Sequence, residues 1–341
     1  MKIIITGGAG YIGSHTVVEL ATAGYKPVII DNFCNSRKDV IERLKDILGF
    51  DVPCHEGNCC DENFMRSVFD KESEITGVVH FAALKAVGES VKRPQLYHTN
   101  NVGAMKVILK VVTDYQIPYL VFSSSACVYG QPDKLPATEE TPLQKATSPY
   151  GETKKICEDL IKELVCLGDQ LRAVSLRYFN PVGAHESAKI GEFPIGTPNN
   201  LVPFVTQAAA GKLEKLVVYG NDYNTPDGSP IRDYIHVVDL AKAHIKALEY
   251  LSKKQDIPKG KGFYDVFNLG TGKGNSVMEV IKTFEQVTGI KLNYVIGPRR
   301  EGDVEALYAS CDKAKRILDW HSERTLAQSL KDSWAWQKTL E

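Results

Sequence analysis

The sequence contains no long hydrophobic run and almost no net charge. None of its apolar runs reaches the roughly 18 residues of a membrane span. The run at residues 3–5 is shorter than the about 7–15 apolar residues of a signal peptide. The formal net charge of −1 lacks the basic excess that nucleic-acid binding requires. We therefore expect a cytoplasmic protein that binds neither nucleic acid nor membranes.

The cysteines give no sign of a metal site or of a disulfide framework. There are eight of them, and they could form bridges only in an oxidising compartment. Cys54, Cys59 and Cys60 lie near His55, but their spacing matches no zinc pattern and no second ligand pair follows. We expect reduced thiols, most of them buried, and no bound metal.

The first half of the chain alternates short apolar runs with amphipathic stretches. Short continuous apolar runs are typical of strands that are buried on both faces of a parallel sheet. Their alternation with helices predicts an α/β fold with a doubly wound parallel Rossmann sheet. We expect strands at 3–6, 28–30, 78–81, 119–123 and 173–176, and helices at 11–23, 62–69, 102–115 and 153–166.

The composition changes after residue 180. Residues 181–203 and 220–230 are rich in proline, glycine and asparagine, and long irregular loops inside a compact protein are usually functional. We expect one domain over 1–180, to which residues from about 232 to 251 return, and a smaller mixed α/β C-terminal lobe within 181–341. The regular segments grouped with this lobe are 216–219, 237–251, 266–269, 277–287 and 292–296.

A glycine-rich turn follows the first expected strand. Residues 8–13 read G-A-G-Y-I-G and lead into a helix, which is the setting in which this motif binds a dinucleotide pyrophosphate. Asp31 ends the second strand, at about the distance expected for a ribose-binding carboxylate. A carboxylate there would repel a 2′-phosphate, so we expect NAD rather than NADP. Arg37 and Lys38 lie several residues beyond the strand end.

A tyrosine and a lysine four residues apart indicate the chemistry. Tyr150 and Lys154 share a helix face, and Ser125 ends a strand where ligands bind in such sheets. Alone, such a pair is a common surface arrangement. A tyrosine is a poor base at neutral pH, but a neighbouring ammonium and a positive nicotinamide would lower its pKa. Tyr150 could then accept a proton from a sugar hydroxyl, with Ser125 as a relay.

With these motifs the chain resembles the extended short-chain dehydrogenase/reductase family, and within it the UDP-glucose 4-epimerases (UDP-galactose 4-epimerases). The resemblance covers essentially the whole length, and several sequence blocks in order are more specific than any one motif. These blocks are residues 6–15, 84–90, 178–181, 198–201, 232–237 and 299–303.

The resemblance implies an NAD-binding first domain and a second lobe that mainly binds the UDP-sugar. It implies catalytic roles for Ser125, Tyr150 and Lys154. The implied cofactor-binding residues are Gly7, Gly10, Tyr11, Ile12, Gly13, Asp31, Asn32, Phe33, Cys34, Asn35, Ser36, Asn58, Cys59, Phe81, Ala82, Ala83, Leu84, Lys85, Asn100, Ser125, Tyr150, Lys154 and Phe179. The implied substrate-binding residues are Lys85, Ser125, Cys127, Tyr150, Asn180, Asn200, Leu201, Tyr219, Arg232, Arg300, Asp303 and Leu307.

The resemblance also implies an isomerase reaction, the interconversion of UDP-galactose and UDP-glucose. The sugar 4-hydroxyl is oxidised with transient reduction of NAD, the 4-keto sugar turns over, and the hydride returns to its other face. In related proteins two helices, equivalent to 102–115 and 153–166, form a four-helix bundle across a homodimer. The same apolar faces could simply cover the sheet.

Three positions depart from the family pattern. Asn58 replaces a usual aspartate near the adenine, and Cys127 replaces a usual threonine beside the serines. Leu307 stands at the gate for the sugar 2-substituent, where tyrosine restricts the site to glucose and galactose and a small residue admits N-acetyl sugars. Leucine is intermediate in size, so we expect that UDP-N-acetylglucosamine is also accepted.

Other readings remain open at this stage. A nucleotide-sugar 4,6-dehydratase needs an Asp-Glu pair where this chain has Ala126 and Cys127, which cannot eliminate water. A UDP-N-acetylhexosamine or dual-specificity 4-epimerase and a UDP-glucuronate 4-epimerase are closer alternatives. A non-catalytic NAD-binding sensor would commonly lose the Tyr150 and Lys154 pair, which this chain keeps.

Overall fold

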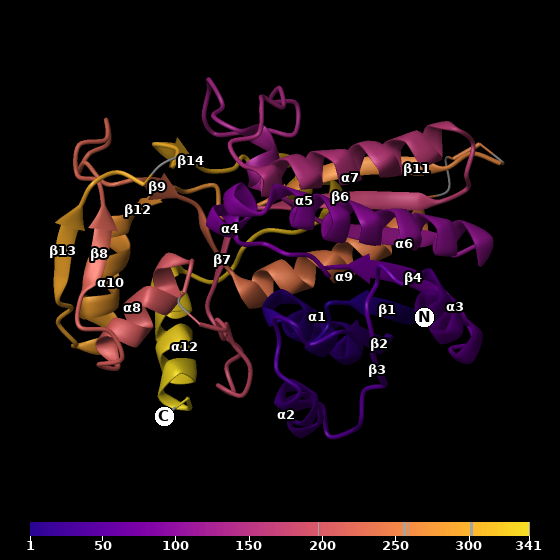
Figure 1. The fold of residues 1–341 in the computed structure, drawn as a ribbon, viewed down its shortest axis with the longest axis horizontal. Helices are drawn as coiled ribbons and strands as arrows, with labels where there is room; N and C mark the ends of the chain where they lie inside the picture. The colour runs from indigo at the N-terminus through magenta and orange to yellow at the C-terminus, as the bar shows by residue number, and fades with distance from the viewer. Residues whose placement is uncertain (197, 255–256, 259, 301–302, 341) are drawn as a thin grey trace.

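The computed structural model describes residues 1–196, 198–254, 257–258, 260–300 and 303–340. Its largest element is a sheet of seven parallel strands (Figure 1). These are β1 (Lys2–Thr6), β2 (Lys26–Asp31), β3 (Cys54–Glu56), β4 (Ile75–His80), β5 (Tyr119–Ser125), β6 (Arg172–Tyr178) and β11 (Phe263–Leu269). Their order is β11-β6-β5-β4-β1-β2-β3, so the direction of winding reverses between β1 and β4. Such sheets bind ligands at this point, and the predicted doubly wound fold is confirmed.

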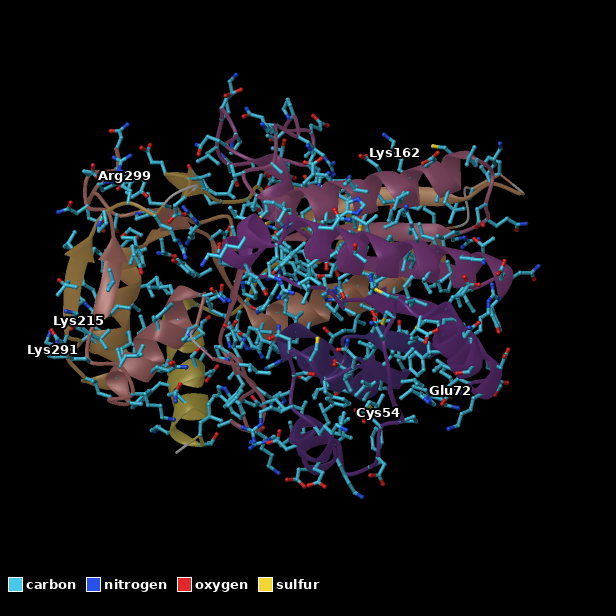
Figure 2. The ribbon with its side chains drawn as sticks, in the orientation of Figure 1. Cys54, Glu72, Lys162, Lys215, Lys291 and Arg299 are labelled. Carbon is cyan, nitrogen blue, oxygen red and sulfur yellow. The ribbon has the colours of Figure 1, made fainter. Side chains whose placement is uncertain are left out.

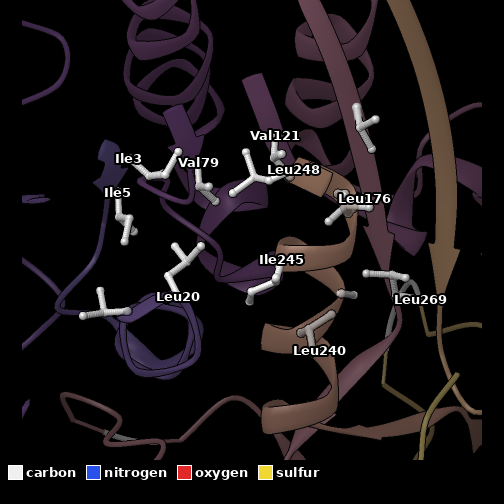
Figure 3. Packing of buried hydrophobic residues seen from close by; sticks show 14 of the residues in the cluster. Ile3, Ile5, Leu20, Val79, Val121, Leu176, Leu240, Ile245, Leu248 and Leu269 are labelled. Carbon is white, nitrogen blue, oxygen red and sulfur yellow. The ribbon is translucent and has the colours of Figure 1, made fainter. Parts of the chain in front are cut away.

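Two hydrophobic cores cover the two faces of this sheet. Because successive side chains of a strand alternate in direction, Ile3 and Ile5 enter one core and Ile4 enters the other. Figure 3 shows Val79 in the first core together with the helix residues Leu20 and Leu248. The first core is covered by α1 (Tyr11–Thr22), α2 (Asp39–Leu48), α9 (Val237–Lys253) and α11 (Asp312–Leu318), and the second by α3 (Glu62–Lys71), α6 (Gly103–Asp114) and α7 (Pro149–Cys166).

A smaller lobe lies beside the carboxyl ends of these strands, on the left in Figure 1. Its core gathers Val205, Leu216, Phe284 and Leu330 from four elements. Strands β8 (Leu216–Tyr219) and β13 (Tyr294–Gly297) pair in parallel. Figure 2 shows Lys215 and Lys291 near the start of this pair. The lobe contains α8 (Leu201–Ala209), β8 (Leu216–Tyr219), α10 (Val277–Thr288), β13 (Tyr294–Gly297) and α12 (Leu326–Lys338).

Short strands connect the lobe to the sheet. One pair continues directly from β6 and into α9, and a three-stranded sheet gathers segments that are far apart in the sequence. The pair is β7 (Asn180–Val182) with β10 (Tyr234–His236), and the sheet has the order β12 (Asn275–Ser276), β9 (Ile231–Arg232), β14 (Ala306–Leu307).

The structure differs from the expected elements at three places. Residues 237–251 and 266–269 were grouped with the second lobe, but neither segment belongs to it. The first forms most of α9, which packs on the central sheet, and the second belongs to β11, which pairs with β6 at the edge of that sheet. Helix α7 begins at Pro149, not at 153, because Ser148 caps it and a proline suits the first helical position. The irregular segment 181–203 contains β7 and the start of α8. The domain limits stay a prediction.

The remaining described elements lie around the same strand ends. The segment after β4 forms α4 (Val87–Lys92), α5 (Pro94–Tyr97) and the π-helical turn His98–Val102, and the segment after β5 forms the 3-10 turn Ala126–Tyr129. All eight cysteines are free thiols, but only Cys59 and Cys157 are buried, so the expectation that most of them are buried is wrong. None of the helices in the described part of the chain is both long and apolar enough to cross a membrane.

Candidate active site

The glycine-rich turn between β1 and α1 leaves no space for side chains. Gly7 has a φ of +72°, and a Cβ atom on Gly13 would lie 2.2 Å from the Gly7 carbonyl oxygen. Helix α1 has Gly10 at its N-cap and no side-chain cap there. Its first amide groups are therefore open to a ligand, as in sites that hold a pyrophosphate.

Asp31 joins the glycine turn to the loop that follows β2. The carboxylate is buried and accepts hydrogen bonds from Ala9 N (3.0 Å), Phe33 N (2.9 Å) and Ser36 Oγ (2.9 Å). These donors fix both carboxylate oxygens at the end of the strand, where the sequence predicts the ribose hydroxyls. Oδ1 accepts two of these bonds and Oδ2 accepts one, so Oδ2 keeps a further lone pair for a hydroxyl donor.

The two cations after Asp31 are engaged elsewhere. Arg37 forms an ion pair with Asp39 (2.8 Å), and Lys38 forms one with Glu56 (2.6 Å). Arg37 also lies over the ring of Phe193 at 4.6 Å. The cations that a 2′-phosphate would need are thus paired with carboxylates, which favours the predicted choice of NAD.

The predicted cofactor residues after β4 lie against the glycine turn. Ala82 N donates to the Thr6 carbonyl (3.1 Å), and a Cβ on Gly7 would be only 2.8 Å from Ala82 N. The turns after β1 and β4 therefore touch. The structure brings the predicted residues Phe81 and Ala82 next to Gly7.

Asn101 is a residue that the sequence analysis missed, although its neighbour Asn100 was predicted. The Asn101 side chain accepts from Leu84 N (2.9 Å) and Asn100 Nδ2 (3.0 Å), and it donates to Thr153 Oγ1 (3.1 Å). It is buried and thus links the loop after β4 to α7. A buried amide in a turn between two helical patterns has no distinctive sequence signal.

The predicted adenine-side residues follow β3. Asn58 is exposed, and its side-chain carbonyl accepts from Cys60 N (2.9 Å), which leaves one lone pair for an adenine amine. Cys59 is buried, and burial raises the pKa of its thiol to about 12. Cys59 therefore packs as a neutral apolar group. Asn32 caps Cys34 N in the same way (3.1 Å).

The predicted catalytic residues meet at the end of β5. Lys154 is buried, and its ammonium donates to the Ser123 carbonyl (2.6 Å) and lies 5.8 Å from the centre of the Tyr150 ring. Ser125 acts on the Tyr150 phenol and lowers its pKa, and its hydroxyl accepts from Cys127 N (3.2 Å). The spacing of four residues on α7 thus brings both side chains to the strand end, as predicted.

The electrostatics of this group differ from the expectation in one respect. Burial raises the pKa of Tyr150 above its usual value, a Cys127 thiolate would add to this, and the hydrogen bond with Ser125 opposes it. The expected lowering by Lys154 is therefore not found. Burial lowers the pKa of Lys154 to about 8, and its hydrogen bond goes to a carbonyl rather than to the phenol. The contribution of the nicotinamide charge stays a prediction.

The predicted diphosphate-binding side chains lie in the second lobe. Arg232 is paired with the carboxylate of Asp303, and Arg300 lies 5.7 Å from the ring centre of Tyr219. Both guanidinium groups can bind a diphosphate through paired donors. Arg299 instead pairs with Asp222 (2.8 Å). Figure 2 shows Arg299 at the outer edge of the lobe.

Leu307, the predicted gate for the sugar 2-substituent, lies in β14 beside β9. Leu307 of β14 pairs with Arg232 of β9, and its side chain packs in a cluster with Phe179 and Ala126. The charge of Arg232 also acts on Cys127. The predicted sugar-contacting residues are therefore near both the catalytic strand end and the diphosphate side.

The remaining predicted substrate residues are at element boundaries. Asn180 N donates to the Asp233 carbonyl (2.8 Å), and Asn200 is the N-cap of α8, which begins at Leu201. Two residues of the 299–303 block, Glu301 and Gly302, lie outside the described residues. A groove of about 570 Å³ lies elsewhere, between α7, β11 and α11, and none of the predicted site residues lines it.

Glu192 is the second residue that the sequence analysis missed. Its carboxylate accepts from Lys85 Nζ (3.2 Å) and from Asn200 Nδ2 (2.7 Å), and both of these residues were predicted. The only sequence signal was its place in the irregular segment 181–203. That segment was expected to be functional, but no pattern singled out this carboxylate.

Proteins with known names resemble the chain over nearly its whole length. The UDP-glucose 4-epimerase of Bacillus subtilis (strain 168) is 48% identical over 339 residues, which are 99% of this chain and 97% of that protein. A crystal structure of the Bifidobacterium longum UDP-glucose 4-epimerase in complex with NAD+ and UDP has a TM-score of 0.93 and 45% identity, and covers 99% of this chain and 98% of that one.

The chain belongs to the UDP-glucose 4-epimerase family. The Stenotrophomonas maltophila UDP-glucose-4-epimerase with bound NAD and formylated UDP-arabinopyranose agrees, with a TM-score of 0.94, 43% identity and coverage of 100% and 98%. The chain also belongs to the wider family whose model is described as GDP-mannose 4,6 dehydratase, which matches residues 4–333. The resemblance to the epimerases and the predicted Rossmann fold are thus confirmed.

A substitution in the glycine turn tests the cofactor site. In Gly13→Ala the new Cβ would meet the Gly7 backbone at 2.2 Å, so the turn and α1 must move apart. We expect the affinity for NAD to fall by at least about tenfold, or about 1.4 kcal/mol. The measurement is the NAD released from purified, denatured protein, together with a titration of NAD. Gly103→Ala is the matched control, because its Cβ would meet only Cys60 Sγ at 3.9 Å. Full retention of NAD by Gly13→Ala would contradict this assignment.

Proposed function

We propose that the chain is an NAD-dependent UDP-glucose 4-epimerase that interconverts UDP-galactose and UDP-glucose through a 4-keto sugar. One observation carries the proposal. Lys154, Tyr150 and Ser125 converge at the end of β5, two strands away from the glycine turn after β1. The relatives named above support it, because two of the solved structures contain bound NAD.

The residues of the turn fit NAD. A Cβ on Gly7 or Gly13 would clash with neighbouring backbone, so the turn stays tight. The amide groups at the start of α1 lack a side-chain cap, and the Asp31 carboxylate is fixed at the end of β2. These groups would hold the pyrophosphate and the adenosine ribose, and the loop at 81–85 with Phe179 would line the rest. When bound, NAD accepts a hydride from the sugar carbon and later gives it back.

The chain's own residues handle the proton. Tyr150 is the group that accepts the 4-hydroxyl proton and later returns it, and Ser125 is placed to orient that hydroxyl. A base must work within reach of the proton and with a pKa near the working pH. Burial raises the pKa of Tyr150, so this step needs positive charge beside the phenol, which the nicotinamide and the Lys154 ammonium together would supply.

The second lobe would anchor UDP while the sugar turns over. Arg232 and Arg300 are suited to the diphosphate, and Asp303 and Asn180 to polar groups of the nucleotide. An anchored diphosphate leaves the bond to the sugar as the axis of rotation. Either face of the 4-keto sugar can then be presented to the same catalytic group.

The alternatives have less support. A dehydratase would need acids where Ala126 and Cys127 stand. A UDP-glucuronate 4-epimerase differs only in the sugar, and direct comparison of the two substrates separates it from the proposed enzyme. A non-catalytic NAD sensor would have no reason to bury an ammonium beside a tyrosine.

The first test is conversion of UDP-galactose to UDP-glucose by pure protein with no NAD added. We expect turnover by the wild type, and a loss of about 10²–10⁴-fold in kcat for Tyr150→Phe, because the ring stays but the proton-transfer group is removed. Binding of UDP, measured by calorimetry, should stay unchanged in this variant.

Tyr115→Phe serves as the control for that variant. Its hydroxyl bonds Asp70 (2.5 Å) at the end of α6, away from the site, so its kcat should match the wild type. Absence of turnover in the wild type, both without NAD and after NAD is added, would rule out the galactose assignment. UDP-N-acetyl sugars and UDP-glucuronate would then be the next substrates.

We also propose that Leu307 admits UDP-N-acetylglucosamine beside UDP-glucose. The Leu307 side chain is 8% exposed and packs with Phe179 and Val128, so the size of residue 307 limits the space next to the sugar. We expect Leu307→Tyr to abolish turnover of the N-acetyl sugar and to leave UDP-galactose within about threefold, since one ring fills the extra pocket. Undetectable turnover of the N-acetyl sugar by the wild type would refute the idea.

We further propose a homodimer formed through α6 and α7. Ile156, Leu160 and Leu164 of α7 and Val107 of α6 are only partly buried although they are apolar. Burying them against a second copy would remove this surface from water. Light scattering should give twice the mass of one chain, and the mass of a single chain would exclude the dimer.

We also propose a cytoplasmic location, with which the free thiols are consistent. Fractionation of cells checks this location.

A further inference from the structure

One carboxylate connects the cofactor side and the substrate side of the site. Glu192 accepts from Lys85 Nζ at 3.2 Å and from Asn200 Nδ2 at 2.7 Å, through the same oxygen atom. Lys85 follows the strand β4 of the central sheet, whereas Asn200 caps α8 of the second lobe. The Glu192 side chain is 12% exposed and that of Lys85 is 49% exposed. A single group therefore fixes two predicted ligand-binding side chains from different parts of the fold.

The backbone that carries Glu192 is held on both sides. Residues 183–192 form an arch, which is closed by an antiparallel bridge between Ala184 and Gly191. Trp336 of α12 donates from Nε1 to the Glu192 carbonyl (2.9 Å), and a Cβ on Gly191 would lie 2.5 Å from its ring. Arg43 of α2 donates to the Lys189 carbonyl (3.2 Å) and stacks on the Trp336 ring. The arch thus has little freedom to move the carboxylate.

The arch also touches the glycine turn. Tyr11 donates from its hydroxyl to the Gly183 carbonyl (2.7 Å) at the first residue of the arch. Burial, and next the Glu192 charge, hold the pKa of Tyr11 above its usual value, so the hydroxyl keeps its proton for this bond. The position of Glu192 is therefore fixed relative to the glycine turn, which is expected to hold the pyrophosphate.

We propose that Glu192 is a positioning residue that aligns Lys85 and Asn200 toward the UDP-sugar and so joins the substrate side of the site to the cofactor side. This rests on the proposed function. Long side chains such as lysine lose much rotamer freedom when they are ordered. A lysine that a carboxylate already holds loses less rotamer freedom when it binds its ligand. The same holds for the Asn200 amide.

The test is Glu192→Gln in the NAD-loaded enzyme. The amide keeps an acceptor for Asn200 but loses the charge that holds Lys85. We expect the dissociation constant of UDP and the KM for UDP-galactose to rise by about three- to tenfold, as for loss of a partly exposed ion pair and a charged hydrogen bond. We expect kcat to change by less than about twofold, because Tyr150 and Lys154 do not contact Glu192. The NAD content should stay at the wild-type value.

A matched control and a double variant separate alignment from general damage. Glu186→Gln lies in the same arch, and its side chain is exposed, so it should match the wild type in UDP binding and in melting temperature. In a Lys85→Gln background, Glu192→Gln should change the dissociation constant of UDP by less than about half as much as it does in the wild type. This follows because the effects of substitutions at two contacting residues are not additive.

Three results would overturn the proposal: tighter UDP binding in Glu192→Gln, a loss confined to kcat, or full additivity with Lys85→Gln. UDP binding is measured by calorimetry and needs no turnover. A wild type that binds UDP but converts no UDP-galactose would therefore contradict the proposed reaction while still testing Glu192.

Discussion

The buried ammonium of Lys154 is the group on which the predicted catalytic site depends. A charge this far from water is costly unless it is paired or hydrogen-bonded, and here it is held by the Ser123 carbonyl and lies 4.8 Å from the Phe122 ring centre. Its pKa falls from 10.5 to about 8. Because the folded pKa is the lower one, the ammonium opposes folding at neutral pH, and this cost is relieved only as the pH rises through that range. The fold therefore gives up stability to keep a cation beside Tyr150.

That cation can reach β5 only because the first turn of α7 comes unusually close to the strand end. A Cβ on Gly151 would lie 3.0 Å from the Cys127 carbonyl oxygen, and Ser148 fixes the start of the helix through a bond from Gly151 N (3.2 Å). The same requirement for close approach recurs at β1, where Gly7 lies against Ala82. Because glycine has no side chain, Gly7 and Gly151 allow the strand ends and the helix starts to lie close together. A ligand can then contact both. The core on each face of the sheet supplies the rigid frame.

Much of this could be predicted from the sequence, because the signals are local. Continuous apolar runs identified the inner strands, and the spacing of Tyr150 and Lys154 placed both on one helix face. The position of β11 could not be predicted, since its apolar run looks the same in either domain and its pairing with β6 joins residues about ninety positions apart. Glu192 was missed for a similar reason, because its partner Lys85 is 107 positions away. The raised pKa of Tyr150 depends on burial, which spacing does not reveal.

The position of Leu307 would link the proposed sugar selection to the proposed diphosphate binding. Leu307 and Arg232 are paired residues of β14 and β9, and the Asp233 carboxylate, next in the chain, accepts from Thr271 N (2.7 Å) and Ala309 N (3.2 Å). A displacement of either strand to enlarge the sugar pocket would therefore also move the guanidinium that is expected to hold the diphosphate. A change of side chain at 307 alters the pocket without moving the backbone. Specificity in this site is thus more easily changed by one side chain than by the loops, because the strand pair and the buried carboxylate fix the backbone around it.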